Sequence, residues 1–266
     1  MIPLVLSLAL LVVGCSPKPS PSPTAGLPLI VGMELNYPPF EMTDVSGKPS
    51  GLSVELAQKL ADSLHRPLQI ENISFDGLIP ALLTKKIDLI LSSLTVTPER
   101  SKVITFSQPY ARIGLALLTR KDSTLLKADD LNRPDRTVVT KRGTSGHLAA
   151  ERLFPEAKQL VVDKDAAAYL EISQGKADAF LYDQLSVARA HQRYPDSTQA
   201  LLSSIQEENW ALGLRSSDAV LLSQVNAFLK AFHQQGGFQK LSSLYLAPEE
   251  ALFRQAGIPF IFFSTP

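Results

Sequence analysis

The sequence has little of three things that would define other classes of protein. It contains one cysteine, so no disulfide bond can form within the chain. No run of eighteen apolar residues follows the first fourteen, so we expect no membrane-spanning helix in the body of the chain. Its 26 basic and 26 acidic side chains balance, and the broad positive field that attracts nucleic acid is missing. Disulfide scaffolds and polytopic membrane proteins are therefore excluded, and we expect no nucleic-acid partner.

The chain does have the composition of a packed globular protein. Hydrophobic residues make up 45% and charged residues 20% of its 266 residues, which is typical of a chain with a buried core. The length suffices for one large domain or two modest ones. The chain has four histidines, His65, His147, His191 and His233, and their spacing is not typical of metal ligands. We expect neither a metal nor another cofactor.

The N-terminus has the features of an export signal. Residues 1–14 are almost wholly apolar and carry no charged side chain, which is typical of the hydrophobic region of a signal peptide. They lead into Cys15 through Leu11-Val12-Val13-Gly14, which resembles the bacterial lipobox, although the usual Lys or Arg before the apolar run is missing. The resemblance implies cleavage before Cys15 and attachment of lipid to its sulfur. We therefore expect an exported protein in the periplasm or at the cell surface, anchored to a membrane through Cys15.

Residues 15–28 have the composition of a linker. Proline recurs at every second position from Pro17 to Pro23, which rules out a helix and disfavours a cysteine buried in an N-terminal helix. Such a segment stays extended, at about 3 Å per residue, and forms a semi-rigid spacer.

From Leu29 onward, short apolar runs alternate with stretches of helical periodicity, which is typical of α/β chains with mostly parallel sheets. Strands are expected at 29–33, 68–70, 87–91, 137–139, 160–162 and 179–181. Helices are expected at 52–64, 78–85, 165–174 and 217–235. A further helix is expected to begin after Thr97, with Thr97 as N-cap and Pro98 at the first helical position.

Two apolar runs, 115–119 and 210–214, could each pass between two lobes. Two such crossings would let the middle of the chain form a second lobe while both ends share the first. We therefore expect a first lobe of residues 29–116 and 212–266 and a second lobe of residues 117–211. The cleft between them could close on a ligand by hinge motion.

The most informative stretch runs from Ser92 to Arg100 (SSLTVTPER) and is followed by the segment from Phe106 to Tyr110 (FSQPY). It leaves a predicted buried strand, exposes hydroxyl side chains and enters a predicted helix. Free amides at a helix start and small hydroxyls bind a carboxylate, and an arginine beside them adds a charge-assisted contact. Alone, the stretch is more typical of a capped helix with a solvated arginine.

Together with other segments, this stretch resembles the polar amino-acid-binding family of bacterial extracellular solute-binding proteins, the capture subunits of ABC importers. The resemblance covers nearly all of residues 29–245 in order. Its further segments are Tyr37-Pro38-Pro39-Phe40, residues 47–60, residues 75–82, Lys86-Ile87-Asp88, Gly143-Thr144-Ser145 and residues 175–183. It implies a two-lobed type 2 periplasmic binding protein fold, with two mostly parallel sheets flanked by helices and joined by two hinge strands.

The resemblance also implies how the cleft holds the two charges of an amino acid. Arg100 would bind the α-carboxylate, helped by the backbone amides and hydroxyls of Thr95 and Ser145. Asp183 would bind the α-ammonium, together with the carbonyl of Ser93 and the hydroxyl of Thr95. Each charge needs such a partner, because a closing cleft removes water from both. For Asp183, a role as a turn former at the end of a strand is the competing interpretation.

Four more residues belong to the expected site. Tyr37 and Phe75 would enclose the ligand side chain by stacking on its aliphatic or cationic part. Plain core packing is the competing interpretation, stronger for Phe75 than for Tyr37, which precedes two prolines. Ser92 and Thr144 belong to the matched segments and are expected at the site with them.

Two charged residues bear on which amino acid binds. Glu34 falls where family members that bind cationic side chains place a carboxylate, which favours arginine, lysine or a related ligand. Lys141 lies where some glutamine-binding members carry a lysine, and it would repel a cationic ligand unless an acid neutralises it. Glu34 and Lys141 could instead pair across the closed cleft and recognise a neutral amide. A basic amino acid is slightly favoured over glutamine or another polar one.

We therefore expect a binding protein without enzymatic activity, which captures an amino acid and delivers it to an ABC permease with its ATPase. The alternative is a periplasmic enzyme on the same fold, such as a cyclohexadienyl or arogenate dehydratase. Such an enzyme needs a positioned general acid, and we expect no spare carboxylate or histidine in the cleft besides Glu34. A ligand-sensing receptor domain would require a spanning segment, which is not expected here.

Overall fold

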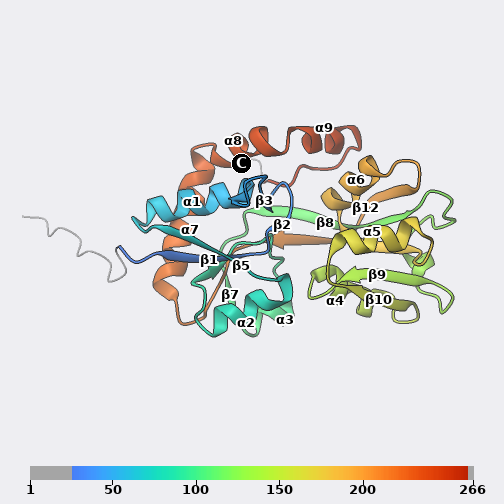
Figure 1. The fold of residues 1–266 in the computed structure, drawn as a ribbon, viewed down its shortest axis with the longest axis horizontal. Helices are drawn as coiled ribbons and strands as arrows, with labels where there is room; N and C mark the ends of the chain where they lie inside the picture. Colours follow the sequence, from blue (N-terminus) through green and yellow to red (C-terminus); the bar gives the residue numbers. More distant parts are fainter. Residues whose placement is uncertain (1–25, 263–266) are drawn as a thin grey trace, which may run out of the picture.

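The computed structural model describes residues 26–262, and the expected signal peptide, Cys15 and most of the 15–28 linker lie outside these residues. Figure 1 shows two lobes side by side along the long axis, joined through the long strands β8 (Ala111–Arg120) and β12 (Thr198–Trp210). Each lobe is a sheet flanked by helices. The predicted two-lobed α/β fold is confirmed.

The first lobe is built on a five-stranded sheet. The strand order is β5 (Leu68–Asn72), β1 (Leu29–Met33), β6 (Leu89–Ile90), β13 (Gly213–Leu214) and β7 (Thr105–Phe106). β1 runs parallel to β5 and β6, whereas β13 runs antiparallel to β6 and β7. A small antiparallel sheet follows β1 and consists of β2 (Asn36–Tyr37), β3 (Glu41–Thr43) and β4 (Pro49–Ser50).

The second lobe is also built on a five-stranded sheet. The strand order is β10 (Lys158–Val162), β9 (Thr137–Lys141), β11 (Ala179–Asp183), β8 and β12. β9 runs parallel to β10 and β11, whereas β8 runs antiparallel to β11 and β12. Both sheets are thus mixed, where the sequence pattern indicates mostly parallel ones. In these two sheets each antiparallel pair involves β8, which is itself a crossing between the lobes, or β13, which follows the second crossing, β12.

The crossing between the lobes is a pair of strands. β8 and β12 pair from Ala111 opposite Trp210 to Arg120 opposite Thr198, with an irregularity in the register between them. The proposed lobe limits, 29–116 with 212–266 and 117–211, put the divisions within β8 and just after β12. The end of the described chain joins the same region, since Phe262 forms a bridge with Ala111.

Helices cover both sheets. Around the first sheet and the crossing lie α1 (Leu52–Ser63), α2 (Leu78–Leu83), α3 (Pro98–Ser101), α7 (Ala219–Gln234), α8 (Gly237–Tyr245) and α9 (Ala247–Gln255). The second sheet is flanked by α4 (Ser145–Leu153), α5 (Asp165–Ser173) and α6 (Gln184–Arg193). Short 3₁₀ turns are η1 (Phe75–Gly77) and η2 (Ala128–Leu131). The helices predicted from periodicity correspond to α1, α2, α5 and α7. Among all helices within residues 26–262, none is long and apolar enough to cross a membrane.

Local chemistry explains why the site-bearing helices begin where they do. The Thr97 hydroxyl accepts a hydrogen bond from the Arg100 amide, and Pro98 occupies the first turn, as the sequence predicts. At α4, the Thr144 hydroxyl accepts from the His147 amide. At α6, the Asp183 carboxylate accepts from the Ser186 amide at 2.8 Å. Two of these cap residues, Thr144 and Asp183, also line the space between the lobes.

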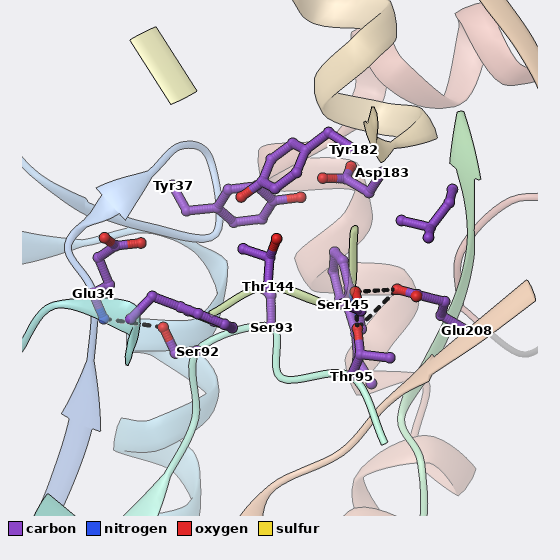
Figure 2. A pocket seen from close by; sticks show the side chains of 13 residues that line it. Glu34, Tyr37, Ser92, Ser93, Thr95, Thr144, Ser145, Tyr182, Asp183 and Glu208 are labelled. Atoms are coloured by element: carbon purple, nitrogen blue, oxygen red, sulfur yellow. Dashed lines mark hydrogen bonds between the residues drawn. The ribbon is translucent and has the colours of Figure 1, made fainter. Parts of the chain in front are cut away.

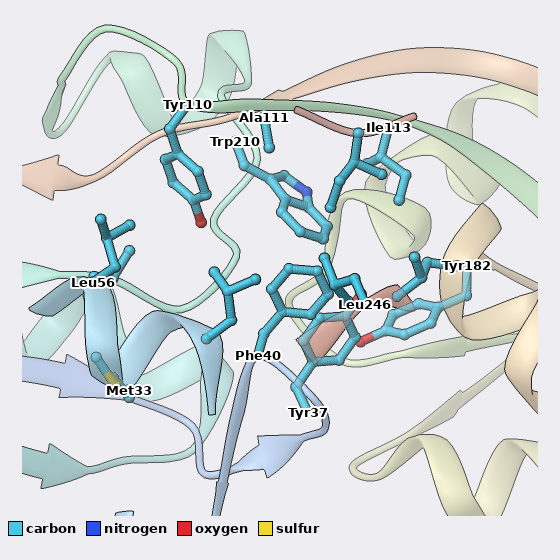
Figure 3. Close-up of a cluster of buried hydrophobic side chains, with 14 of the residues drawn as sticks. Met33, Tyr37, Phe40, Leu56, Tyr110, Ala111, Ile113, Tyr182, Trp210 and Leu246 are labelled. Atoms are coloured by element: carbon cyan, nitrogen blue, oxygen red, sulfur yellow. The ribbon is translucent and has the colours of Figure 1, made fainter. Parts of the chain in front are cut away.

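An aromatic cluster fills the interior beside the crossing strands (Figure 3). Tyr37 stacks on Phe40 with ring centres 5.5 Å apart, and both rings meet Trp210 edge-on. Tyr182 meets Tyr37 edge-on from the second lobe at 6.3 Å. Burial of such rings is among the largest apolar contributions that a core can contain. The cluster therefore ties the small sheet, the crossing and the second lobe together.

Candidate ligand-binding site

A cavity lies between the lobes and takes its walls from both (Figure 2). Its volume is about 40 Å³, which is room for a few water molecules and smaller than typical small-molecule sites. The lining residues are Glu34, Tyr37, Phe75, Ser92, Ser93, Thr95, Leu115, Thr144, Ser145, Tyr182, Asp183, Glu208 and Trp210. Nine of the eleven predicted site residues are among them; Arg100 and Lys141 are not.

Arg100 lies behind the wall, at what we call the carboxylate end of the cavity, made of Thr95, Arg100, Ser145 and Glu208. Its guanidinium donates to the carbonyl of Thr95 at 2.6 Å and, across the lobes, to the carbonyl of Gly143 at 2.9 Å. Only 6% of the residue is exposed, and burial lowers the pKa of the guanidinium to about 10. Arg100 therefore remains a cation at neutral pH and ties the first lobe to the loop before α4.

The loop that receives Arg100 requires a glycine. Gly143 has φ +73°, a left-handed conformation that side chains disfavour. A Cβ there would lie 3.1 Å from Cβ of Asp76, on the opposite lobe. Its lack of a side chain therefore lets the two lobes approach closely enough for Arg100 to reach the Gly143 carbonyl.

Glu208, near the end of β12, is a cavity residue that the sequence analysis missed. Its Oε2 accepts hydrogen bonds from the hydroxyls of Thr95 at 2.9 Å and Ser145 at 2.8 Å, one from each lobe. Figure 2 shows the three side chains converging. Burial raises the pKa of this carboxyl, and Arg100 acts in the opposite direction. The expectation of no spare cleft carboxylate besides Glu34 is therefore wrong.

A sequence pattern for Glu208 did exist. Alternate residues of a strand share a face, and Glu208 precedes the buried Trp210 by two, whereas Glu207 and Asn209 are exposed. The sequence does not predict that this face contacts the hydroxyls of Thr95 and Ser145, which lie 113 and 63 residues away in the chain.

Asp183 lies at the end of β11, lines the cavity and caps α6. The binding and structural interpretations of this residue are thus compatible, since one carboxylate can cap a helix and still face a cavity. Burial raises the pKa of its carboxyl. On the opposite wall, Ser93 has φ +48° and donates its hydroxyl to the Glu41 carboxyl at 3.0 Å. Glu41 is fully buried, and this burial raises its pKa to about 8.

Tyr37 and Phe75 are packed differently from what the sequence analysis expects. Tyr37 lines the cavity but is also packed in the aromatic cluster, with 7% of its surface exposed. Phe75 is only half-buried, and two cations flank its ring: Arg100 Cζ at 5.4 Å and Lys141 Nζ at 5.8 Å from the ring centre. Core packing is therefore the stronger competing role for Tyr37, not for Phe75.

Glu34, Phe75 and Lys141 form what we call the side-chain end of the cavity. Glu34 follows β1 in the first lobe, Lys141 ends β9 in the second, and their side chains form an ion pair across the cleft. Lys141 is almost completely buried. The Ser92 hydroxyl accepts from the Glu34 amide at 3.0 Å and holds the acid in place. In Figure 2, Glu34 and Glu208 lie at opposite sides of the cavity.

Two mixed sheets, two crossing strands and a charged cavity between the lobes define a two-lobed solute-binding protein. Within residues 26–262, no group of three His, Cys, Asp or Glu side chains is placed to hold a metal ion. The chain belongs to the bacterial extracellular solute-binding proteins, family 3, whose family model matches residues 29–248. The family resemblance identified from the sequence is confirmed.

Three relatives illustrate the similarity. The L-cystine-binding protein TcyJ of Escherichia coli K12 is 28% identical over 223 residues, 83% of each chain. The arginine-binding extracellular protein ArtP of Bacillus subtilis is 29% identical over 241 residues, 89% of this chain and 92% of ArtP. Among solved structures, a putative binding component of an ABC transporter from Wolinella succinogenes, complexed with lysine, has a TM-score of 0.77 and 35% identity. That alignment covers 83% of this chain and 96% of the other.

Proposed function

We propose that this protein captures a polar amino acid in the cavity between its lobes and delivers it to an ABC permease with its ATPase. The observation that carries the proposal is a small interlobe cavity lined by a buried carboxylate, Asp183, with a buried cation, Arg100, against its wall. A zwitterion needs one such partner for each of its charges. The relatives named for cystine and arginine, and the similar structure complexed with lysine, support an amino acid as the ligand.

We favour a basic amino acid. Three lining residues are acids, Glu34, Asp183 and Glu208, whereas two cations, Arg100 and Lys141, lie at the edges. When all five are charged in the free protein, the excess is negative and attracts a ligand with one more positive than negative charge. The Glu34–Lys141 pair keeps glutamine or another neutral polar amino acid as the alternative, because the pair leaves the side-chain end neutral.

The location of the protein follows from its family and its N-terminus. The family is one of extracellular solute-binding proteins, which supports export. We propose that the exported protein is anchored to a membrane by lipid on Cys15, because the preceding residues resemble a lipobox. A Cys15→Ser variant should lose metabolically incorporated fatty acid and appear in the soluble fraction; continued labelling would contradict the anchor.

An enzyme remains the second candidate because of one observation, the buried acid Glu208 within the cavity. A carboxyl whose pKa is raised can serve as a general acid. The relatives are named as binding proteins, which favours capture without chemistry. Incubation with arogenate and prephenate distinguishes the two, since consumption of either by pure protein would establish an enzyme.

The proposed function is tested by identifying the small molecules that remain bound to the purified protein. The protein is purified, unfolded to release bound small molecules, and these are identified by mass spectrometry. Calorimetry of refolded protein then measures arginine, lysine, histidine, glutamine and glutamate. We expect a retained amino acid and binding that is tightest for arginine or lysine; binding of none of the five, with no amino acid retained, would overturn the proposal.

A further inference from the structure

The carboxylate end of the cavity already contains a carboxylate. Oε2 of Glu208 accepts hydrogen bonds from the hydroxyls of Thr95 and Ser145, which are the two hydroxyls expected to hold the ligand carboxylate. Its Oε1 accepts from the Gln206 amide at 3.1 Å. The protein's own acid thus occupies the hydrogen-bonding position that an amino acid would use.

Two charged carboxylates cannot share these partners at low cost. Each hydroxyl has a single proton to donate, so it serves one acceptor at a time. Two carboxylates close together in a site poor in water raise the pKa of one of them strongly, because like charges repel. Only 4% of Glu208 is exposed, so it has no solvent to turn toward while the lobes are closed.

The charges around Glu208 come from several elements. Arg100, on α3, is the cation whose charge lowers the pKa of Glu208, against the larger effect of burial. From α4, Arg152 donates to Gln206, the partner of Glu208. On β8, the residue opposite Glu208 is the apolar Ile113. Asp183 on β11 lines the same cavity and adds a further negative charge. One cation therefore cannot neutralise both Glu208 and an incoming carboxylate.

We propose that Glu208 makes carboxylate binding depend on a proton: a ligand carboxylate binds at the carboxylate end only together with a proton taken up by Glu208. The proton comes from solvent, and the resulting carboxyl group then donates a hydrogen bond to the ligand carboxylate. No bond other than that O–H forms. This inference rests on the proposed function, because it requires an amino acid whose carboxylate lies beside Arg100.

A definite pH dependence follows. Once the pH exceeds the value at which Glu208 ionises in the free protein, affinity should fall by about tenfold per pH unit. The fall should stop where Glu208 of the complex also ionises. A ligand without a carboxylate has no such requirement, so its binding should take up no proton through Glu208.

The test is calorimetry of L-arginine and L-glutamine between pH 5 and 9, in two buffers that differ in ionisation enthalpy. Such a pair of buffers reports the protons bound with the ligand. Wild type should take up as much as one proton, whereas Glu208→Gln should bind with an affinity that changes less than threefold over this range. Glu207→Gln is the matched control, since Glu207 is 72% exposed beside Arg112, and it should behave as wild type.

A second ligand makes the test independent of the variant. Agmatine, which is arginine without its carboxylate, should bind wild type without the proton uptake seen for arginine. Equal proton uptake by wild type and Glu208→Gln, or no uptake by wild type at any pH, would overturn the role of Glu208 and leave amino-acid capture standing. Failure of wild type to bind either amino acid at any pH would overturn both proposals.

Discussion

The two ends of the cavity differ in how their buried charges are paired. At the side-chain end, Glu34 and Lys141 form a direct ion pair across the lobes. At the carboxylate end, Arg100 and Glu208 are also opposite charges, but each bonds to neutral partners, carbonyls for one and hydroxyls for the other. The side-chain end is therefore electrically complete without a ligand, whereas the carboxylate end offers hydroxyl donors that a ligand can take over.

This difference indicates where affinity and selectivity arise. A buried charge that loses its partner costs several kcal/mol, whereas a pair that already neutralises itself adds little when a ligand arrives. We therefore expect the carboxylate end and Asp183 to set how tightly any amino acid binds. The side-chain end should decide among amino acids.

The largest effect is expected from breaking the carboxylate end. Arg100→Ala should weaken binding of every amino acid by about 3–5 kcal/mol, because the ligand carboxylate would then be buried without a cation as its partner. Calorimetry measures the loss. Arg142→Ala, at an exposed arginine paired with Asp163 at 2.8 Å, is the control and should bind normally. Normal binding by Arg100→Ala would contradict the proposed contact.

A smaller loss, about 2–3 kcal/mol in affinity, is expected from Asp183→Asn. The asparagine can still cap α6, so the thermal midpoint should stay close to that of wild type. Asp183→Ala should lose the same affinity and, in addition, about 1 kcal/mol of unfolding free energy, because the Ser186 amide loses its acceptor. If Asp183→Ala loses stability but binds amino acids as tightly as wild type, Asp183 acts only as the cap of α6 and does not bind the ligand.

Glu41, which accepts a hydrogen bond from Ser93 beside the cavity, should make the unfolding free energy of the protein depend on pH. Its pKa is about 8 in the folded protein and near 4.5 when unfolded, so the folded state holds the proton more tightly. The stabilisation is complete below pH 4.5 and is lost as the pH rises through 8. At about 1.4 kcal/mol per pH unit, the unfolding free energy should fall by roughly 2 kcal/mol between pH 6 and 7.5.

Denaturant titrations at these two pH values measure the fall. Glu41→Gln should remove most of it, whereas Glu55→Gln on α1, beside Tyr245, should not. A fall of the same size in Glu41→Gln would assign the pH dependence to another group.

The smallest effect is expected at the side-chain end. Glu34→Gln should weaken binding of arginine and lysine by about 1 kcal/mol, because Lys141 is then left to repel the ligand cation. Glutamine should bind about as well as before, since it carries no side-chain charge. Parallel calorimetry of the three amino acids gives the comparison, and an equal loss for all three would remove Glu34 from the specificity determinants.

The sequence was sufficient for the parts of the fold that local patterns encode. The apolar stripe of α1, the Thr97 cap with Pro98 and the buried run of β11 each predict an element that the structure contains. The predicted cavity residues come together because the family motifs follow the strand ends. Glu208 and the packing of Tyr37 depend on contacts between distant segments, and no local pattern reports those. The mixed strand directions likewise follow from the crossings and not from periodicity.

The central claim is that one amino acid lies across the cavity with its two backbone charges held by Arg100 and Asp183. A crystal structure of the protein with the amino acid it retains tests this most directly. We predict the ligand carboxylate within hydrogen-bonding distance of Arg100, Thr95 and Ser145, and the ammonium at Asp183. A ligand with these two groups exchanged, or one bound outside the cavity, would contradict the account.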